Sequence, residues 1–165
     1  MTSVDRPSFI IDQNVGKLAK LLRLLGYDAV FFSGGADAQM VAIALAENRV
    51  ILTRDTHVLE RSPVTRGKIK AVLIRTDDPN SQIRQVIGAF DLLSAARELT
   101  LCLECNVALV PRDKASLEGK VPPHVFETHD NFRQCPRCER IYWPGTHWAA
   151  MKKRLEELRQ PGEKV

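Results

Sequence analysis

Four cysteines in the last third of the sequence have the spacing of a metal site. They form two Cys-x2-Cys pairs separated by 29 residues, namely Cys102, Cys105, Cys135 and Cys138. Each pair can place two thiolates on one tight turn, so two turns supply four sulfurs at the corners of a tetrahedron. Zn²⁺ prefers this ligand set, and four thiolates leave no coordination position open. The spacing therefore predicts a structural zinc site.

Other uses of these cysteines lead to different expectations. Iron accepts the same four thiolates, whereas buried free thiols or a redox pair would need no metal, although a redox motif needs only one Cys-x2-Cys. His124, His129 and His147 are candidate substitute ligands. Paired thiols at this spacing are typical of metal sites in cytosolic proteins. The first residues lack the apolar core of a signal peptide, and no apolar run is long enough to span a membrane, so we expect a cytoplasmic protein without a membrane partner.

Two short apolar runs end on aspartates, and a third aspartate lies between them. The runs are Phe-Ile-Ile-Asp at 9–12 and Val-Ile-Leu-Thr-Arg-Asp at 50–55. They are rich in β-branched residues, as buried strands of a parallel sheet are. The carboxyl ends of such strands meet at the edge where functional crevices form, so Asp12 and Asp55 should lie at one edge of the sheet. With Asp37, which starts an apolar helix, they could bind a hard divalent cation such as Mg²⁺ or Mn²⁺.

Each of these aspartates also has a purely structural interpretation. Asp is a favoured N-cap, and all three precede predicted helices or helical turns. Asp77 and Asp78 follow another predicted strand and could join the site, or they could form a turn and cap the next helix. A divalent ion held by the cluster would suit phosphodiester hydrolysis, because it activates water and neutralises the charge that builds on oxygen.

Basic residues flank the predicted carboxylate site. Lys17 and Arg54 could hold substrate phosphates, and Gly16 would let a helix N-terminus approach one of them. Both basic residues are equally compatible with solvated surface positions. Lys20 and Arg23 are expected to share an outward stripe with Lys17 on the same helix. The net charge of +4 is spread evenly along the chain, so it permits a polyanionic partner without requiring one.

Alternating strands and helices must position these residues. Apolar residues at strand and helix spacing predict strands at 9–12, 28–32, 50–53 and 71–74, and helices at 15–25, 36–47 and 81–96. A short helical turn at 56–61 and a loop at 63–68 lie between the last two strands. This alternation is typical of an α/β fold with a parallel sheet.

The composition changes after about Leu99. Prolines exclude long helices in this part, and only 147–159 has the pattern of a final helix. We therefore predict an α/β domain at 1–98 and a small cysteine module with a C-terminal helix at 99–165. Aromatic residues near the second cysteine pair could form the small core of the module against that helix, or stack on unpaired bases, namely Tyr142, Trp143, His147 and Trp148. Basic residues beside the same pair could contact phosphates, namely Arg133, Arg137 and Arg140.

Several segments resemble one known family. Residues 37–55, Asp-Ala-Gln-Met-Val-Ala-Ile-Ala-Leu-Ala-Glu-Asn-Arg-Val-Ile-Leu-Thr-Arg-Asp, resemble the core signature of PIN domains, and Ile-Ile-Asp at 10–12 resembles their first strand. With 16–28, 141–148 and the paired cysteines, these segments are most similar to the PIN-like RNase domains that carry a C-terminal zinc ribbon. That family is named after the C-terminal region of the Mut-seven exonuclease.

This resemblance implies a PIN-like three-layer α/β sandwich followed by a zinc ribbon. It also implies a Mg²⁺- or Mn²⁺-dependent ribonuclease with an RNA substrate, in which Asp12, Asp37 and Asp55 take the metal-binding positions. PIN nucleases usually add a further acidic residue between the first two aspartates, but no Glu lies between them here. The site then consists of three carboxylates or is completed by Asp77 or Asp78.

Two other functions are compatible with the same features. A degenerate site would leave an RNA-binding or adaptor module without catalysis. A toxin of a toxin–antitoxin pair shares the PIN fold, but such toxins are typically compact and lack a zinc appendix. Loss of turnover with retained RNA affinity in an Asp55→Asn variant would distinguish an enzyme from a pure binder.

Overall fold

A four-stranded parallel sheet forms the centre of the N-terminal half. The computed structural model describes residues 6–159. The strands lie in the order β2-β1-β3-β4, and every neighbouring pair is parallel. Their bounds are β1 (Phe9–Asp12), β2 (Ala29–Phe32), β3 (Val50–Thr53) and β4 (Ala71–Leu73). The predicted α/β class with a parallel sheet is confirmed.

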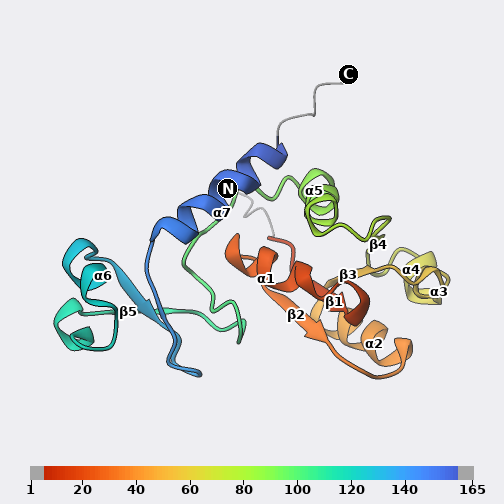
Figure 1. Ribbon diagram of the computed structural model, residues 1–165. Helices are drawn as coiled ribbons and strands as arrows, with labels where there is room; N and C mark the ends of the chain where they lie inside the picture. The colour runs from red at the N-terminus through yellow and green to blue at the C-terminus, as the bar shows by residue number, and fades with distance from the viewer. Residues whose placement is uncertain (1–5, 160–165) are drawn as a thin grey trace, which may run out of the picture.

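Helices cover both faces of this sheet (Figure 1). On one face lie α1 (Lys17–Leu24) and α5 (Pro79–Phe90), and on the other lies α2 (Asp37–Glu47) with the short α3 (Thr56–Leu59) and α4 (Ser62–Thr65). Alternate strand residues serve the two faces, so that Ile11 packs in the first core and Ile10 in the second. Strands buried on both faces need apolar residues at every position, which explains the continuous runs in the sequence.

The first helix was predicted at 15–25 but begins later, after a separate turn. A 3-10 turn, η1 (Gln13–Val15), follows β1 directly, and α1 begins only at Lys17. Asp12 caps the turn by accepting a hydrogen bond from the Gln13 backbone N–H. The predicted loop at 63–68 also differs, because its first residues belong to α4, where Pro63 occupies the first turn as proline often does.

The predicted third helix ends about one and a half turns early. It stops at Phe90, and Asp91 adopts a left-handed backbone with φ of 50°. The Leu92 carbonyl, which a continuing helix would pair with a later N–H, instead accepts a hydrogen bond of 2.7 Å from the buried Tyr27 hydroxyl. The Arg97 N–H likewise bonds the Leu25 carbonyl at 2.8 Å. Contacts with a distant segment therefore end this helix.

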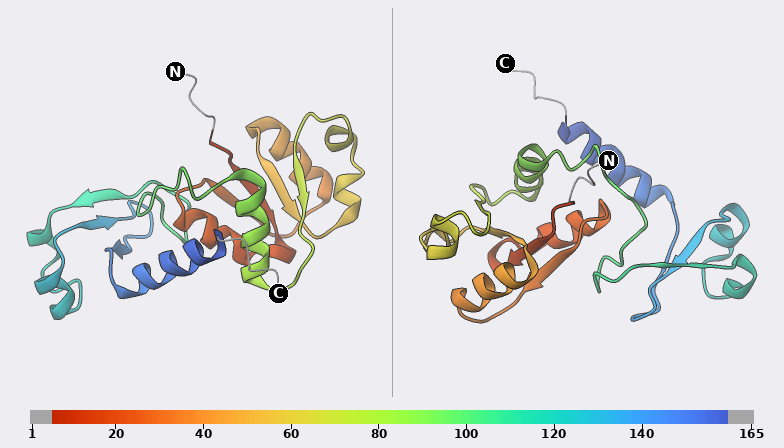
Figure 2. Two further views of the ribbon diagram at one scale, coloured as in Figure 1. Left: turned by 90° about the horizontal axis from the view of Figure 1, so that it is seen from above. Right: turned by 180° about the vertical axis from the view of Figure 1, so that it is seen from behind.

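The C-terminal half builds a second, antiparallel sheet beside the first (Figure 2). Its strands are β5 (Val110–Arg112), β6 (Phe132–Gln134) and β7 (Ile141–Tyr142), in that order. The turn η2 (Lys114–Leu117) and α6 (Pro123–Thr128) connect β5 to β6. A separate small core surrounds the buried Phe132, against which Trp143 packs at a centroid distance of 6.3 Å.

The final helix, α7 (Thr146–Arg159), leaves this small sheet and returns to the N-terminal half (Figures 1 and 2). Leu155 is buried in the core that α1 and α5 share, and Trp148 packs against the same core. Of the aromatic residues expected in the cysteine module, Trp143 lies in its core and Trp148 does not, while His147 is exposed. Between residues 6 and 159, no helix is both long and apolar enough to cross a membrane.

Candidate functional site

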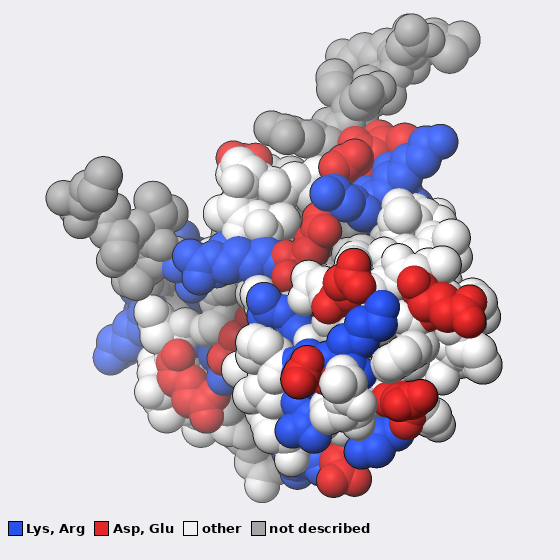
Figure 3. Space-filling view, turned by 90° about the vertical axis from the view of Figure 1, so that its left-hand side faces the viewer, with Lys and Arg blue, Asp and Glu red and all other residues white. Residues whose placement is uncertain are grey.

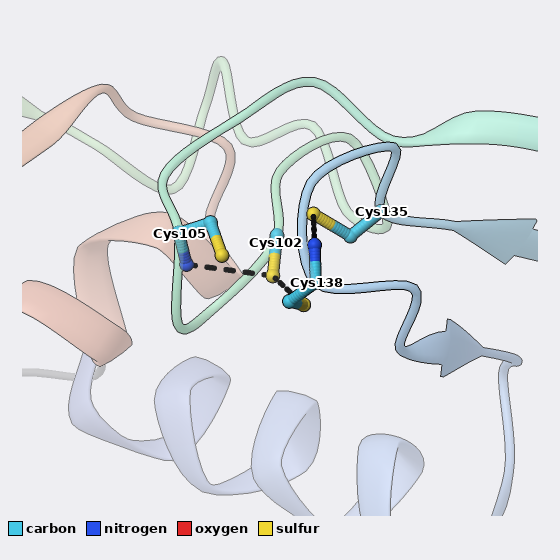
Figure 4. A group of neighbouring side chains, drawn as sticks. All are labelled: Cys102, Cys105, Cys135 and Cys138. Atoms are coloured by element: carbon cyan, nitrogen blue, oxygen red, sulfur yellow. Dashed lines mark hydrogen bonds between the residues drawn. The ribbon is translucent and has the colours of Figure 1, made fainter.

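The four predicted metal ligands converge in space. Their sulfur atoms all lie within 4.8 Å of one another, and the side chains point toward a common centre (Figure 4). Within residues 6–159 they are the one group of three or more His, Cys, Asp or Glu ligands gathered so closely. None of the three candidate histidines belongs to it. Four sulfurs at this separation fit a tetrahedral metal ion such as zinc.

The two cysteine turns have the same backbone conformation. In each, the residue after the second cysteine donates its N–H to the carbonyl of the first, from Asn106 to Cys102 at 2.9 Å and from Glu139 to Cys135 at 3.0 Å. Both donor residues are left-handed, with φ of 58° and 65°. The N–H of the second cysteine then points at the sulfur of the first, at 3.4 Å in both turns. The two Cys-x2-Cys motifs thus form two turns with the same hydrogen bonds.

A tyrosine contacts the first of these sulfurs. The Tyr142 hydroxyl lies 3.2 Å from Cys102 Sγ and accepts a hydrogen bond from the Leu103 N–H. Burial raises the pKa of the Cys102 thiol, but the hydroxyl and nearby backbone N–H groups favour the thiolate, so the pKa falls to about 7. Burial and the neighbouring cysteines raise the pKa of Cys105 to about 12. Metal binding must therefore release protons, and it should weaken as the pH falls.

The first cysteine turn is hydrogen-bonded to β2, one of the two edge strands of the parallel sheet. The Arg23 guanidinium donates to the carbonyls of Ala29 in β2 at 3.0 Å, Leu103 at 2.8 Å and Glu104 at 3.3 Å. The Asn106 side chain accepts from the Ala29 N–H at 3.1 Å. Arg23 was expected on the outer stripe of its helix, but only 8% of it is exposed. That prediction was wrong, because the module covers this face of α1.

Loss of the Arg23 contacts should destabilise the protein measurably. Arg23→Met keeps the apolar stem but leaves three carbonyls without a donor, so we expect the free energy of unfolding to fall by about 2–4 kcal/mol. Lys20→Met is the matched control on the same helix, because Lys20 makes only an exposed pair with Glu104 at 2.7 Å and should cost at most about 1 kcal/mol. Urea unfolding of the metal-loaded proteins would measure both. Equal losses would show that Arg23 is not a structural link.

The carboxyl ends of β1 and β3 are joined through a buried threonine. Thr53, which is fully buried, donates its hydroxyl to Asp12 Oδ2 at 2.6 Å and accepts from the Asp55 N–H at 3.0 Å. The other oxygen of Asp12 accepts from the Gln13 N–H at 2.8 Å. Asp12 and Asp55 therefore lie at one edge of the sheet, as adjacent parallel strands require. Thr53 had no predicted role, although its position before Arg54-Asp55 in the strand is the signal that could have identified it.

The Asp12 carboxylate is mostly buried, where a negative charge normally needs a cationic partner. Only 9% of the residue is exposed, and its two oxygens meet neutral donors. Across residues 6–159, no Lys, Arg or His nitrogen lies within 4.0 Å of this carboxylate. Buried carboxylates in proteins are usually paired with a cation or bind a metal ion.

The other two aspartates lie on neighbouring elements. Asp55 is half-buried and caps α3 by accepting from the His57 N–H at 2.9 Å. Asp37 is half-buried in the first turn of α2, one residue after the N-cap Ala36. In the described part of the chain, the three aspartates do not approach one another as closely as the cysteines do. The structure thus links Asp12 to Asp55 through Thr53. Asp37 lies apart from this link, at the start of α2.

Comparison with known proteins assigns the whole arrangement to one family. The family model described as the Mut7-C RNAse domain matches residues 7–155. The chain belongs to the Mut7-C RNAse domain family. The matched region includes the parallel sheet with its aspartates and all four cysteines. No curated protein and no solved structure matches the chain. Membership of this family indicates a nuclease of the RNase type, with RNA as the substrate.

Two of the remaining predicted residues line a cavity beside the turn that follows β1 of this Mut7-C domain. Lys17 and Asp77 line a space of about 300 Å³ between the turn after β1 and the start of α5. Arg54 forms an ion pair with Asp77 that joins the loops after β3 and β4. Asp78 caps α5 by accepting from the Ser81 N–H and hydroxyl at 2.9 and 2.8 Å, and these bonds lower its pKa.

The cysteine end of the Mut7-C domain does not present a uniform charge. On the face shown in Figure 3, Lys and Arg side chains are interspersed with Asp and Glu. Of the three arginines beside the second cysteine pair, Arg133 is half-buried, while Arg137 and Arg140 are exposed. Phosphate contacts on this face would therefore rest on individual arginines rather than on a broad basic patch.

Proposed function

We propose that this protein is a divalent-metal-dependent ribonuclease that hydrolyses RNA phosphodiesters at the carboxyl edge of its parallel sheet. The observation that carries the proposal is Asp12, a mostly buried carboxylate with neutral neighbours and no cationic partner among residues 6–159. Its link through Thr53 to Asp55 supports a shared site. A metal cation is the partner that such a carboxylate lacks.

The proposed catalytic residues are Asp12, Asp37 and Asp55, which would hold Mg²⁺ or Mn²⁺. When bound, the ion supplies a Lewis acid and an activated water for phosphodiester hydrolysis. Mg²⁺ keeps several waters and needs only one or two protein carboxylates, so the aspartates need not touch one another. Thr53 would orient Asp12. Lys17 and Arg54 would hold substrate phosphates, and Asp77 or Asp78 could add a carboxylate.

The proposal extends to the architecture. We assign residues 1–98 to a nuclease domain of PIN-like three-layer form, which the helices on both sheet faces support. Residues 99–165 would form a zinc ribbon with a C-terminal helix, in which zinc stabilises the fold without taking part in the reaction. The donor set supports zinc, because four thiolates close the coordination sphere. The cytoplasmic location stays a prediction from cysteine usage.

One observation favours an alternative, an RNA-binding module without catalysis. Among the described residues, the three aspartates do not form a compact group, and Asp12 and Asp55 both serve as caps. A site whose carboxylates had purely structural roles would bind RNA and not cut it. The two functions differ in turnover, not in affinity.

The deciding experiment is RNA cleavage under controlled metal supply. Structured and single-stranded RNAs are incubated with the zinc-loaded protein after dialysis against buffer without Mg²⁺ or Mn²⁺, and each ion is then added back. We expect cleavage only after addition, and a loss of about 10³-fold in Asp55→Asn because one carboxylate ligand is removed. Asp113→Asn changes an exposed carboxylate of the cysteine module and should cut like the wild type.

Either of two results would contradict the proposed ribonuclease activity. Cleavage that survives Asp55→Asn unchanged would mean a contaminant or a different active site. No cleavage by the wild type with retained RNA binding would favour the binding module.

A further inference from the structure

The two cysteine turns are supported in different ways. The second turn connects two paired strands of the small sheet, β6 and β7, and the Gln134 side chain in β6 donates to the Glu139 carbonyl of that turn at 2.8 Å. The first turn is closed by an isolated bridge between Leu101 and Ala108, outside both sheets. A two-stranded hairpin is marginally stable on its own. The first turn therefore needs support from elsewhere in the molecule.

A carboxylate before β2 supplies part of that support through the side chain of Asn106. The Asn106 amide donates to Asp28 Oδ1 at 2.7 Å, and its oxygen accepts from the Ala29 N–H at 3.1 Å. Asn106 has a left-handed backbone, which asparagine tolerates better than most residues do. Its counterpart in the second turn, Glu139, has the same backbone but an exposed side chain. Only the first turn thus uses this position to contact the parallel sheet.

Asp28 is in turn held by an arginine that touches the starts of three strands. Arg49 donates to both Asp28 oxygens, at 2.9 and 3.2 Å, and also to the Phe9 carbonyl at 3.2 Å. Phe9 starts β1, while Asp28 and Arg49 directly precede β2 and β3. Only 11% of the Arg49 side chain is exposed. Because a two-pronged arginine–carboxylate pair fixes both partners, the Asp28 carboxylate has a defined position although it lies at the surface.

A turn that already has its final shape binds a metal ion more tightly than a mobile one. A metal ion that must first order its ligands binds with less net free energy, because the lost freedom opposes binding. Asn106 follows Cys105 directly, and its N–H closes the turn onto the Cys102 carbonyl at 2.9 Å. A side chain anchored at this position therefore holds the turn that presents both sulfurs.

We propose that Asp28 and Asn106 are positioning residues of the zinc site, so that the parallel sheet sets part of the affinity for zinc. The cysteine module is then not an independent metal-binding unit. Coupling of this kind is reciprocal, so bound zinc also holds Asn106 against Asp28 and stabilises the start of β2. The inference rests on the zinc site proposed above, but it does not depend on ribonuclease activity.

Zinc affinities of matched variants test this proposal without any measurement of cleavage. The probe is Zn²⁺ itself, in competition with a chromogenic chelator at constant pH. Asn106→Gly removes the side chain and keeps the turn, because glycine adopts a left-handed backbone readily. We expect it to weaken zinc binding by about 10- to 100-fold, as losses of residues that orient metal ligands do. Glu139→Gly is the same change in the second turn and should keep the wild-type affinity.

Asp28→Ala tests the same link from the sheet side. It removes one of the two Asn106 contacts, so we expect a smaller loss of zinc affinity than in Asn106→Gly. The double variant should bind zinc as Asn106→Gly does, because the two residues act through one hydrogen bond. Losses that add in the double variant would contradict this link.

Two further results would overturn the proposal. If the wild type and Asn106→Gly bind zinc equally, or if Glu139→Gly loses as much affinity as Asn106→Gly, the four-cysteine site stands and the positioning role does not. A wild type that takes up no zinc would remove both the zinc site and this inference. Neither result bears on the ribonuclease, which the cleavage experiment decides separately.

Discussion

Asp12→Asn should abolish metal-dependent RNA cleavage while the protein stays folded. Asparagine fills the same volume, and its carbonyl oxygen can accept from the Gln13 N–H as Asp12 Oδ1 does at 2.8 Å. Its amide can face Thr53, because a hydroxyl is able to accept as well as donate. The negative charge is lost, however, and the proposed metal ion would lose a mostly buried ligand. We expect turnover to fall by about 10³-fold or more.

The Thr53→Val variant tests how much the orientation of the Asp12 carboxylate contributes to activity, because the charge of Asp12 is kept. Valine has nearly the shape of threonine but lacks the hydroxyl that contacts both Asp12 and the Asp55 N–H. The carboxylate keeps its charge and loses one of its two donors, so we expect a smaller loss in turnover, about 10-fold, and a higher Mn²⁺ concentration for half-maximal activity. Rates over a Mn²⁺ titration and thermal unfolding would be measured for both variants. A full rate in Asp12→Asn would remove this carboxylate from the site.

Zinc removal should unfold the C-terminal sheet and loosen the edge of the parallel sheet. Structural zinc sites contribute about 10–16 kcal/mol of binding energy, which is comparable with the whole stability of a domain, about 5–15 kcal/mol. The small core around Phe132 cannot replace that contribution. Because Arg23 and Asn106 tie the first cysteine turn to Ala29 in β2, the disturbance should reach the N-terminal half.

Cys135→Ser and a zinc-selective chelator would produce this state by independent routes. Metal analysis should find one zinc ion per wild-type chain and none in Cys135→Ser, and hydrogen exchange should show lost protection at β5, β6 and the Ala29 N–H. His147→Ala is the control, because this exposed histidine lies outside the four-sulfur group and should keep the zinc. A Cys135→Ser protein with a full zinc content would mean that other residues bind the metal.

The sheet and the cysteine site were predictable because their signals are local. Val50–Thr53 is apolar at each of its first three positions because both of its faces are buried, and the observed bounds of this strand are those predicted. The Cys-x2-Cys spacing fixes the turn geometry, so the convergence of four sulfurs needed only that the two turns meet. These features depend on neighbouring residues and on the general geometry of parallel sheets.

Three features depended on segments distant in the sequence. Helix α5 ends at Phe90, and the Tyr27 hydroxyl donates a hydrogen bond to the Leu92 carbonyl just beyond it. Arg23 is buried because a turn about 80 residues away supplies carbonyls for its guanidinium, and a charged residue on a helix is otherwise expected in solvent. Trp148 packs on the N-terminal core because α7 crosses back over it. In each case, a long-range contact outweighs a local preference.

The sequence by itself determined the α/β class, the four-cysteine cluster and the edge of the sheet at which Asp12 and Asp55 lie. Periodicity and spacing are properties of the local chain, and they persist in any fold that buries these apolar runs. Only the tertiary structure decided that Thr53 joins the two aspartates and that Asp12 is buried without a cationic partner among the described residues. Burial and hydrogen bonding between strands depend on which segments become neighbours, and that is decided when the whole chain packs.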